Sequence, residues 1–160
     1  MKNNKFISPE KFWKQVNKKR MGAGVIFFND KGEILLVKAE HKKYWSLPGG
    51  VVDENESPRM TAIREVKEEI SLSIKSCEFL CVDYESARNI KGEALQFIFY
   101  GGVLDKDIVN KIKIDNEIQE YKFVLPQTAL KFLNKRRRKR FTKSIKAIKN
   151  SQMIYLENGE

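Results

Sequence analysis

The chain is poor in cysteine and histidine and has no long apolar run. Its 160 residues include 2 cysteines and 1 histidine. This scarcity argues against a disulfide framework and against the usual Cys/His zinc sites. No apolar run approaches the ~20 residues that cross a bilayer, so we expect no membrane segment and no membrane partner.

The N-terminus also lacks the apolar stretch of a signal peptide, because "MKNNKFISPEKFWKQ" carries lysines without one. Cys77 and Cys81 lie in an apolar stretch and have no metal-type companions, so we expect buried free thiols and a cytoplasmic protein. The composition, 41% hydrophobic and 32% charged, is that of a soluble globular protein with one sizeable core.

Positive charge is concentrated in one segment. The net charge is +10, and residues 131–150 contain ten Lys or Arg and no acidic residue. The rest of the chain is therefore neutral, and the basicity is a local feature.

Hydrophobic periodicity and turn residues predict alternating strands and helices. Residues 8–19 predict a short N-terminal helix, 21–28 and 33–39 a hairpin, and 44–52 a loop that runs into a short strand. A helix follows at 58–70, then strands at 72–84, 93–104 and 118–124, a helix from 125 through the basic segment, and a final strand at 152–159. This order predicts an α/β layered domain with a mixed sheet.

The stretch "REVKEEI" places Glu65, Glu68 and Glu69 at i, i+3 and i+4 of the expected helix. Like charges at i,i+4 destabilise a helix by roughly 0.2–0.5 kcal/mol per pair. The helical wheel puts them nearly opposite the apolar stripe, so we expect them to point together away from the core. Either they form a solvated acidic face, or they bind a hard cation such as Mg²⁺ or Mn²⁺ that neutralises them. The apolar stripe consists of Ile63, Val66 and Ile70.

The flanking residues favour the second alternative. Five residues separate Gly50 from Glu56, and seven more lead to "REVKEEISL". This spacing resembles the Nudix box, in which G and E are followed by R-E-aliphatic-x-E-E-x-G-aliphatic. Ser71 departs from the pattern, because it stands where the family has a glycine that caps the helix in the left-handed conformation. The matching positions are Gly50, Glu56, Arg64, Glu65, Val66, Glu68, Glu69 and Leu72.

The resemblance implies a Nudix fold, an α/β/α sandwich with a mixed β-sheet. It implies one Nudix hydrolase domain over residues 1–160, with an N-terminal helical extension at 1–19 and a basic C-terminal helix at 131–150. The family hydrolyses a phosphoanhydride in nucleoside diphosphate derivatives with the help of a divalent cation. We therefore expect a Nudix hydrolase that uses Mg²⁺ or Mn²⁺.

The resemblance also implies roles for individual residues. Glu65, Glu68, Glu69 and Gly49 are expected to hold the metal. Arg64 is expected to pair with Glu56 or Glu65 and orient it, since a guanidinium fork suits a carboxylate. Glu65, Glu68 and Arg64 are thereby candidate catalytic residues, and Gly50, Glu56, Val66 and Leu72 are the structural positions of the box.

A catalytic base is expected outside the box, as in many relatives that use a glutamate before a late strand. Glu117 and Glu120 are the candidates, and we favour Glu117 because Glu120 already falls in the expected strand. Both remain candidates for ordinary surface charges.

The substrate is less clearly encoded. Lys38, Tyr44 and Gly50 are candidate substrate contacts; Lys38 is equally a strand-end surface lysine, and His41 is expected to be a surface residue. Trp45 belongs either to the core or to a base-stacking surface, and one of Phe27 and Phe28 is expected in the core. The chain lacks the downstream proline or tyrosine typical of relatives that act on ADP-ribose or dinucleoside polyphosphates. We therefore expect a nucleoside di- or triphosphate.

The basic run "NKRRRKR" leaves two alternatives. It is either a solvated helix, or a nucleic-acid contact through Arg136, Arg137 and Arg138. In the second case the protein is an RNA 5′-end pyrophosphohydrolase or an RNA-binding module. In both cases we expect this helix to lie away from the glutamates. A homodimer is a further expectation, since many relatives are dimers.

Overall fold

The computed structural model describes residues 7–160, in which seven strands form a single mixed sheet. Its spatial order is β6-β2-β1-β5-β4-β7, and β3 pairs with β1 beside this path. The β1–β5 and β4–β7 pairs are parallel and the others antiparallel. The strands are β1 (Arg20–Asn29), β2 (Ile34–Ala39), β3 (Gly49–Val51), β4 (Glu78–Glu85), β5 (Ala94–Leu104), β6 (Ile118–Val124) and β7 (Ile154–Glu157).

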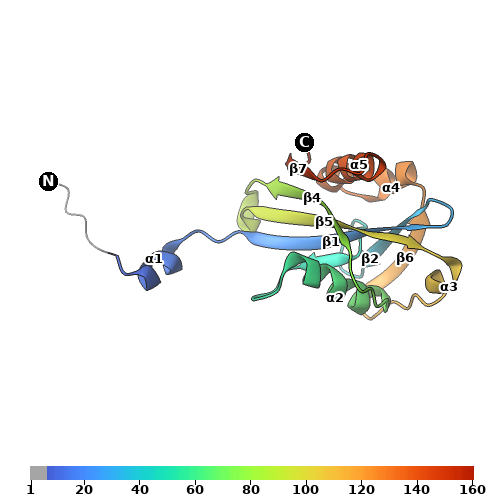
Figure 1. Ribbon diagram of the computed structural model, residues 1–160, viewed down its shortest axis with the longest axis horizontal. Helices are drawn as coiled ribbons and strands as arrows, with labels where there is room; N and C mark the ends of the chain where they lie inside the picture. Colours follow the sequence, from blue (N-terminus) through green and yellow to red (C-terminus); the bar gives the residue numbers. More distant parts are fainter. Residues whose placement is uncertain (1–6) are drawn as a thin grey trace.

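Helices cover both faces of this sheet, with α2 on one face and α4 and α5 on the other (Figure 1). The helices are α1 (Pro9–Gln15), α2 (Pro58–Ile70), α3 (Lys106–Val109), α4 (Pro126–Phe132) and α5 (Lys135–Lys149), with one 3₁₀ turn at Asn89–Lys91. The expected α/β/α sandwich with a mixed sheet is confirmed.

Two separate apolar layers result from strand alternation. In β1, Val25 and Phe27 pack with Val66 and Ile70 of α2, whereas Ile26 belongs to the layer under α4 and α5. Successive strand residues point to opposite faces, so one buried strand supplies both layers. The two cysteines are buried free thiols, as expected.

Most predicted elements are confirmed, including the β1–β2 hairpin, the β4–β5 pair and α2 with the expected bounds. The strand expected at 72–84 begins only at Glu78, because Leu72, Ile74 and Cys77 pack as an irregular segment against the α2 layer. The helix expected from 125 onward is broken: α4 ends at Phe132, and the Asn134 side chain caps α5 by accepting the Arg137 N–H at 3.0 Å. Helix α3, whose N-cap is Asp105, was not among the predicted elements.

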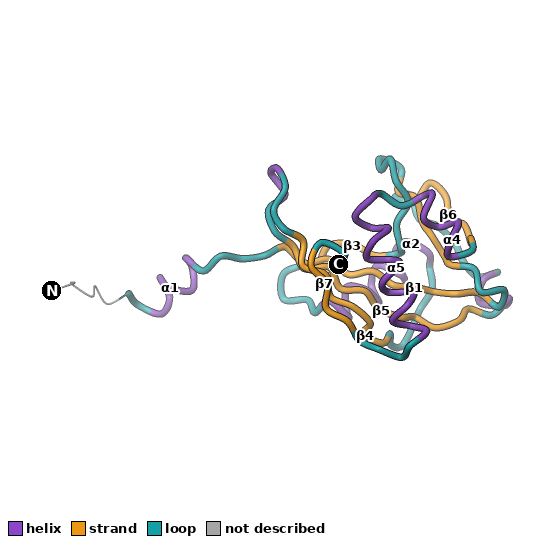
Figure 2. Tube along the Cα trace, turned by 90° about the horizontal axis from the view of Figure 1, so that it is seen from above, coloured by secondary structure: helices purple, strands orange, loops and turns teal. Residues whose placement is uncertain are grey.

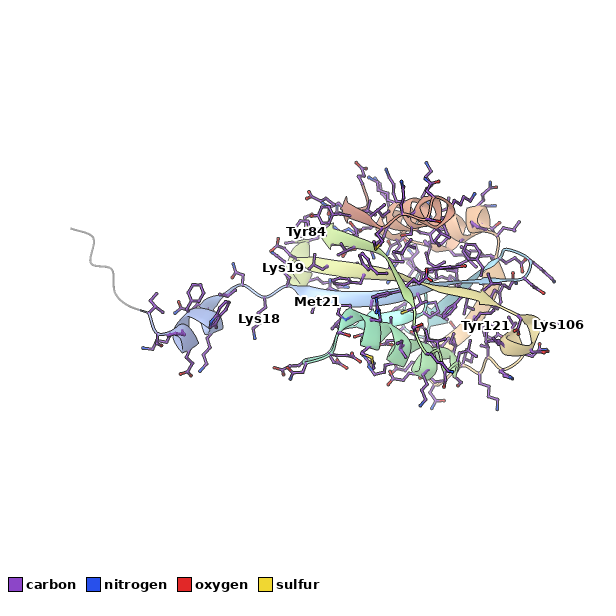
Figure 3. All side chains as sticks on the ribbon, in the orientation of Figure 1. Lys18, Lys19, Met21, Tyr84, Lys106 and Tyr121 are labelled. Carbon is purple, nitrogen blue, oxygen red and sulfur yellow. The ribbon has the colours of Figure 1, made fainter. Side chains whose placement is uncertain are left out.

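The N-terminal helix is confirmed as α1, with Ser8 as its N-cap and Pro9 at its start. It projects from the body of the molecule in both orthogonal views (Figures 1 and 2) and has no buried residue. Lys18 and Lys19 lie in the connection that joins it to β1 (Figure 3). Residues 1–6 of the expected extension lie outside the described residues.

Candidate functional site

Helix α2 holds the carboxylates in a fixed register. Ser57 caps it by accepting the Met60 N–H at 3.2 Å, and Pro58 occupies its first turn. Val66 and Ile70 are fully buried against the sheet. Because this face is fixed by packing, the positions of Glu65, Glu68 and Glu69 follow from helix geometry.

Arg64 is the centre of the carboxylate cluster. Its Nε and Nη2 donate to the two Glu56 oxygens, each at 2.9 Å, which is the bidentate arrangement. Its Nη1 donates to Glu65 Oε1 at 3.1 Å and to Glu68 Oε2 at 2.8 Å. The sequence left open whether Arg64 contacts Glu56 or Glu65; it contacts both, and Glu68 as well.

The Arg64–Glu56 pair fixes the charge of both groups. Hydrogen bonds from Arg64 and from the Thr61 hydroxyl lower the pKa of Glu56 to about 2. The same contact with Glu56 raises the pKa of Arg64. Both side chains are therefore charged across the physiological pH range.

Glu69 and Glu65 are the two carboxyl groups of the cluster whose pKa values are raised. Burial, together with the neighbouring Glu65 and Asp115 carboxylates, raises the pKa of Glu69 to about 7, although the Gly49 N–H and Lys42 act to lower it. Burial also raises the pKa of Glu65, and Glu68 and Glu117 add to this. The expectation that all three glutamates point away from the core is wrong for Glu69, which is 8% exposed because β3 covers that side of α2.

Two glycines bring β3 against this cluster. The Gly49 N–H donates to Glu69 Oε2 at 2.8 Å. A Cβ on Gly50 would lie 2.1 Å from Glu65 Oε1, and one on Gly49, with φ of 143°, would lie 2.1 Å from the Ala23 carbonyl oxygen. Only glycine permits this close approach.

Glu117 and Asp115 approach the cluster from the turn before β6. Glu117 is exposed and lies close enough to raise the pKa of Glu65. Asp115, which sequence reasoning missed, does the same for Glu69. Among residues 7–160, no three His, Cys, Asp or Glu side chains yet converge as a metal site. The Arg64 guanidinium instead bridges two of the glutamates.

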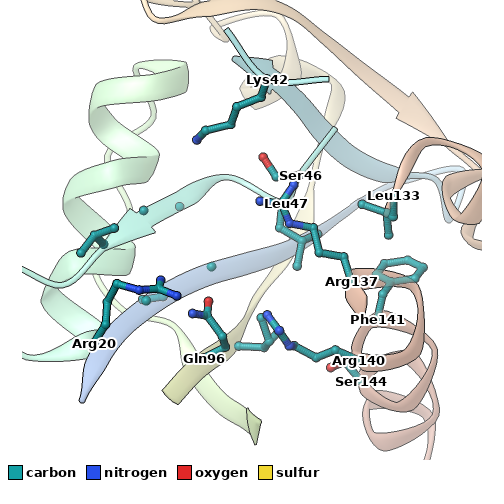
Figure 4. A pocket seen from close by; sticks show the side chains of 17 residues that line it. Arg20, Lys42, Ser46, Leu47, Gln96, Leu133, Arg137, Arg140, Phe141 and Ser144 are labelled. Atoms are coloured by element: carbon teal, nitrogen blue, oxygen red, sulfur yellow. The ribbon is translucent and has the colours of Figure 1, made fainter. Parts of the chain in front are cut away.

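A cavity of about 180 Å³ opens on the α5 face of the sheet, next to Gly49 and Gly50 (Figure 4). Gly22 and Gly24 of β1 give it a flat floor, and Leu47 and Ile98 add apolar surface. Its polar lining consists of Arg20, Lys42, Ser46, Gln96, Arg137, Arg140 and Ser144. Of these residues, only Arg137 was a candidate from the sequence, as a nucleic-acid contact. The alternation of Arg20, Gly22 and Gly24 along β1 is the sequence pattern that could have indicated this cavity.

The three arginines that were expected to contact nucleic acid are bound to groups of the protein itself. Arg136 forms an ion pair with Glu85 at 3.1 Å, and Arg137 Nη1 donates to the Trp45 carbonyl at 3.1 Å. Arg138 is exposed, and its Nε donates to the Leu133 carbonyl at 2.7 Å. Helix α5 lies on the sheet face opposite α2 and its glutamates, as expected (Figure 1), but Arg137 lines the cavity on that face. These arginines anchor α5 because the glutamate and carbonyl groups facing them require partners.

The other candidate substrate residues lie outside this cavity. Lys38 lies within β2, opposite Glu120 of β6, and Tyr44 is 41% exposed. His41 is exposed, as expected. Trp45 belongs to the core, where its ring packs edge-on against Phe132 at 5.7 Å.

Comparison with known proteins agrees with the carboxylate helix and the sandwich fold. The sequence model of the NUDIX domain matches residues 18–145. The chain therefore belongs to the NUDIX family, the Nudix hydrolases, whose members cleave phosphoanhydride bonds. No helix among the described residues is long and apolar enough to cross a membrane.

Individual relatives are more distant. A 48-residue stretch is 50% identical to a Bacillus subtilis protein named "Putative 8-oxo-dGTP diphosphatase", covering 30% of this chain and 32% of that protein. Over 105 residues the chain is 30% identical to the RNA pyrophosphohydrolase of Pelagibacter ubique, and the match covers 62% of this chain and 66% of that protein. The crystal structure of the MutT protein from Methanosarcina mazei matches with a TM-score of 0.69 at 24% identity, covering 84% of this chain and 99% of that one. The chain thus spans less than two thirds of the two sequence relatives.

Proposed function

We propose that this protein is a divalent-metal-dependent pyrophosphohydrolase whose substrate is a nucleoside di- or triphosphate. One observation carries the proposal. The Gly49–Gly50 segment has an acidic cluster against one side and a cation-lined cavity against the other. A nucleotide that crosses this segment places its scissile phosphates at the glutamates and another part of the molecule in the cavity.

The side chains present suit Mg²⁺ or Mn²⁺. Glu65, Glu68 and Glu69 offer hard oxygen donors, and the pKa of Glu65 and Glu69 is raised first by burial and then by neighbouring carboxylates, which a bound cation would offset. With Gly49, they are the residues that would hold the ion. A divalent cation supplies charge neutralisation for the diphosphate and acidifies water.

The chain's own groups then have distinct tasks. Arg64 holds Glu56 in a bidentate pair and positions Glu65 and Glu68. Water attacks phosphorus, the bridging P–O bond breaks, and Glu117 accepts the proton of the water. Glu120 is the weaker candidate for this task, since it lies in β6 opposite Lys38.

The test is product release from a nucleotide panel with Mg²⁺ or Mn²⁺, comparing the parent with Glu68→Gln. Glu78→Gln, an exposed carboxylate at the start of β4, is the matched control. We expect turnover of nucleoside di- or triphosphates in the parent and in Glu78→Gln, reduced at least about 100-fold in Glu68→Gln. Turnover that survives Glu68→Gln unchanged would refute the proposal.

RNA is the second candidate substrate, supported by the Pelagibacter relative. The exposed cations of α5 are mostly lysines rather than the arginines first considered. A 5′-triphosphorylated RNA therefore belongs in the panel. The exposed α5 lysines are Lys135, Lys139, Lys143, Lys146 and Lys149.

A further inference from the structure

The cavity on the α5 face has an unusual charge balance. Four of its side chains are cationic, and none of the described residues that line it is acidic. Figure 4 shows Arg20, Gln96, Arg137 and Arg140 directed toward the same space from β1, β5 and α5. The cationic side chains are Arg20, Lys42, Arg137 and Arg140.

Only part of this charge is balanced by the protein. Arg140 is neutralised by Asp83, at 2.8 Å from its Nε, and by Glu85. Arg137 makes its hydrogen bond to a neutral carbonyl, and burial together with Arg140 lowers its pKa. A cation in such a position is short of negative charge.

Arg20 supplies the second observation. Its Nε is buried and has no hydrogen-bond partner among the described residues. Buried donors are nearly always paired, so an unpaired one beside a cavity indicates a missing acceptor. The Gln96 amide lies over Gly22 on the cavity floor, where a Cβ on Gly22 would meet it at 2.7 Å, and it faces the same space as Arg20 (Figure 4).

The missing acceptor is better supplied by an anion than by a neutral base. A neutral base would leave Arg20 and Arg137 partly desolvated without a counter-charge, which is costly. A phosphate offers only acceptors and carries the opposite charge, and guanidinium groups bind it in charge-assisted pairs. The phosphates that are cleaved do not fill this role, because they belong at the α2 glutamates beyond Gly50.

Building on the function proposed above, we propose that the α5-face cavity binds a second phosphate of the substrate, separate from the scissile diphosphate, through Arg20 and Arg137. The preferred substrates are then nucleotides that carry both a 5′-diphosphate or triphosphate and a further phosphate. That group is either a 3′-phosphate monoester or the first phosphodiester of a 5′-triphosphorylated oligonucleotide.

The experiment compares kcat/KM for a nucleoside triphosphate, its 3′-phosphorylated form and a 5′-triphosphorylated dinucleotide. Charge-assisted hydrogen bonds of this kind predict that the two phosphate-bearing substrates are preferred by about tenfold or more. Arg20→Gln should bring this ratio close to one. Arg88→Gln, an exposed arginine outside the cavity lining, should retain it.

Other outcomes separate this proposal from the function on which it rests. Turnover with no preference in the parent would overturn the second-phosphate site and leave the hydrolase intact. A preference for the dinucleotide alone that Arg20→Gln retains would also overturn it, since base or ribose would then be recognised instead of phosphate.

A binding measurement covers the case in which no substrate is turned over. Titration of Glu68→Gln with a nucleoside 3′,5′-bisphosphate and with the 5′-monophosphate should show about tenfold tighter binding of the bisphosphate, lost in the added Arg20→Gln change. Equal affinities would overturn the site whatever the activity.

Discussion

Gly50 has almost no room for any other side chain. A Cβ there would lie 2.1 Å from Glu65 Oε1, and the Glu65 carboxylate would have to move. We expect Gly50→Ala to lower kcat/KM about 100-fold, because misplacement by an ångström has effects of that size. A melting curve would establish that the variant is folded. Parent-like turnover would show that Glu65 tolerates displacement.

Ser71 adopts the left-handed conformation, with φ of 58°, at the C-terminus of α2. A residue with a Cβ is strained there by roughly 1 kcal/mol, and glycine is not. Ser71→Gly should therefore raise the free energy of unfolding by about 1 kcal/mol in denaturant titration. Ser73→Gly, two residues on and outside this conformation, should give no gain. Equal effects of the two changes would contradict the capping explanation.

The raised pKa of Glu69 makes the stability of the metal-free protein depend on pH. Its pKa rises to about 7 in the folded chain, from 4.5. The folded state thus binds this proton more tightly, so the contribution of Glu69 to stability is fully present below pH 4.5 and is lost as pH rises through about 7. The shift corresponds to about 3 kcal/mol. Unfolding with a chelator between pH 5 and 8 should show this loss, and Glu69→Gln should remove it.

At the scale of elements, a buried ion pair joins the sheet to α5. Asp83 of β4 is fully buried, accepts from Arg140 Nε at 2.8 Å and accepts the Gly159 N–H at 2.9 Å. Removing one partner of such a pair leaves an uncompensated buried charge, which costs about 3–5 kcal/mol. Asp83→Ala should lower stability by that amount in denaturant titration. Glu157→Gln, an exposed change on β7, should alter it by less than about 0.5 kcal/mol.

This pair also connects stability with the cavity. Arg140 lines the α5 face while its charge is held by Asp83 and Glu85. The same helix presents Arg137 to the cavity without a carboxylate partner. The acidic residues of β4 therefore determine which arginine of α5 remains attractive to an anion.

At the scale of the whole molecule, α1 is separate from the sandwich. It has no buried residue, while Phe12 and Trp13 are 50% and 67% exposed. Deleting residues 1–16 should leave the free energy of unfolding within about 0.5 kcal/mol of the parent value. A large loss on thermal or denaturant unfolding would mean that the extension packs on the domain. The single domain over 1–160 and the homodimer stay predictions.

The box could be read from the sequence because its function depends on local spacing. Carboxylates at i, i+3 and i+4 lie on one side of any helix, and the glycine and arginine of the box stand at fixed sequence distances from them. The strands and α2 were predictable for the same reason, since periodicity and caps act within a few residues. The α4–α5 break was missed because one residue, Asn134, offers a cap within an otherwise helical pattern.

The sequence by itself thus determined the family, the sandwich of alternating elements and the carboxylate helix. Only the tertiary structure decided that Glu69 is buried, that Arg136 and Arg137 point inward, and that Arg20 meets α5 across a cavity. Those properties depend on partners far apart in the chain, such as Glu85 with Arg136. Burial and charge compensation arise where such segments meet, and spacing along the chain does not encode them.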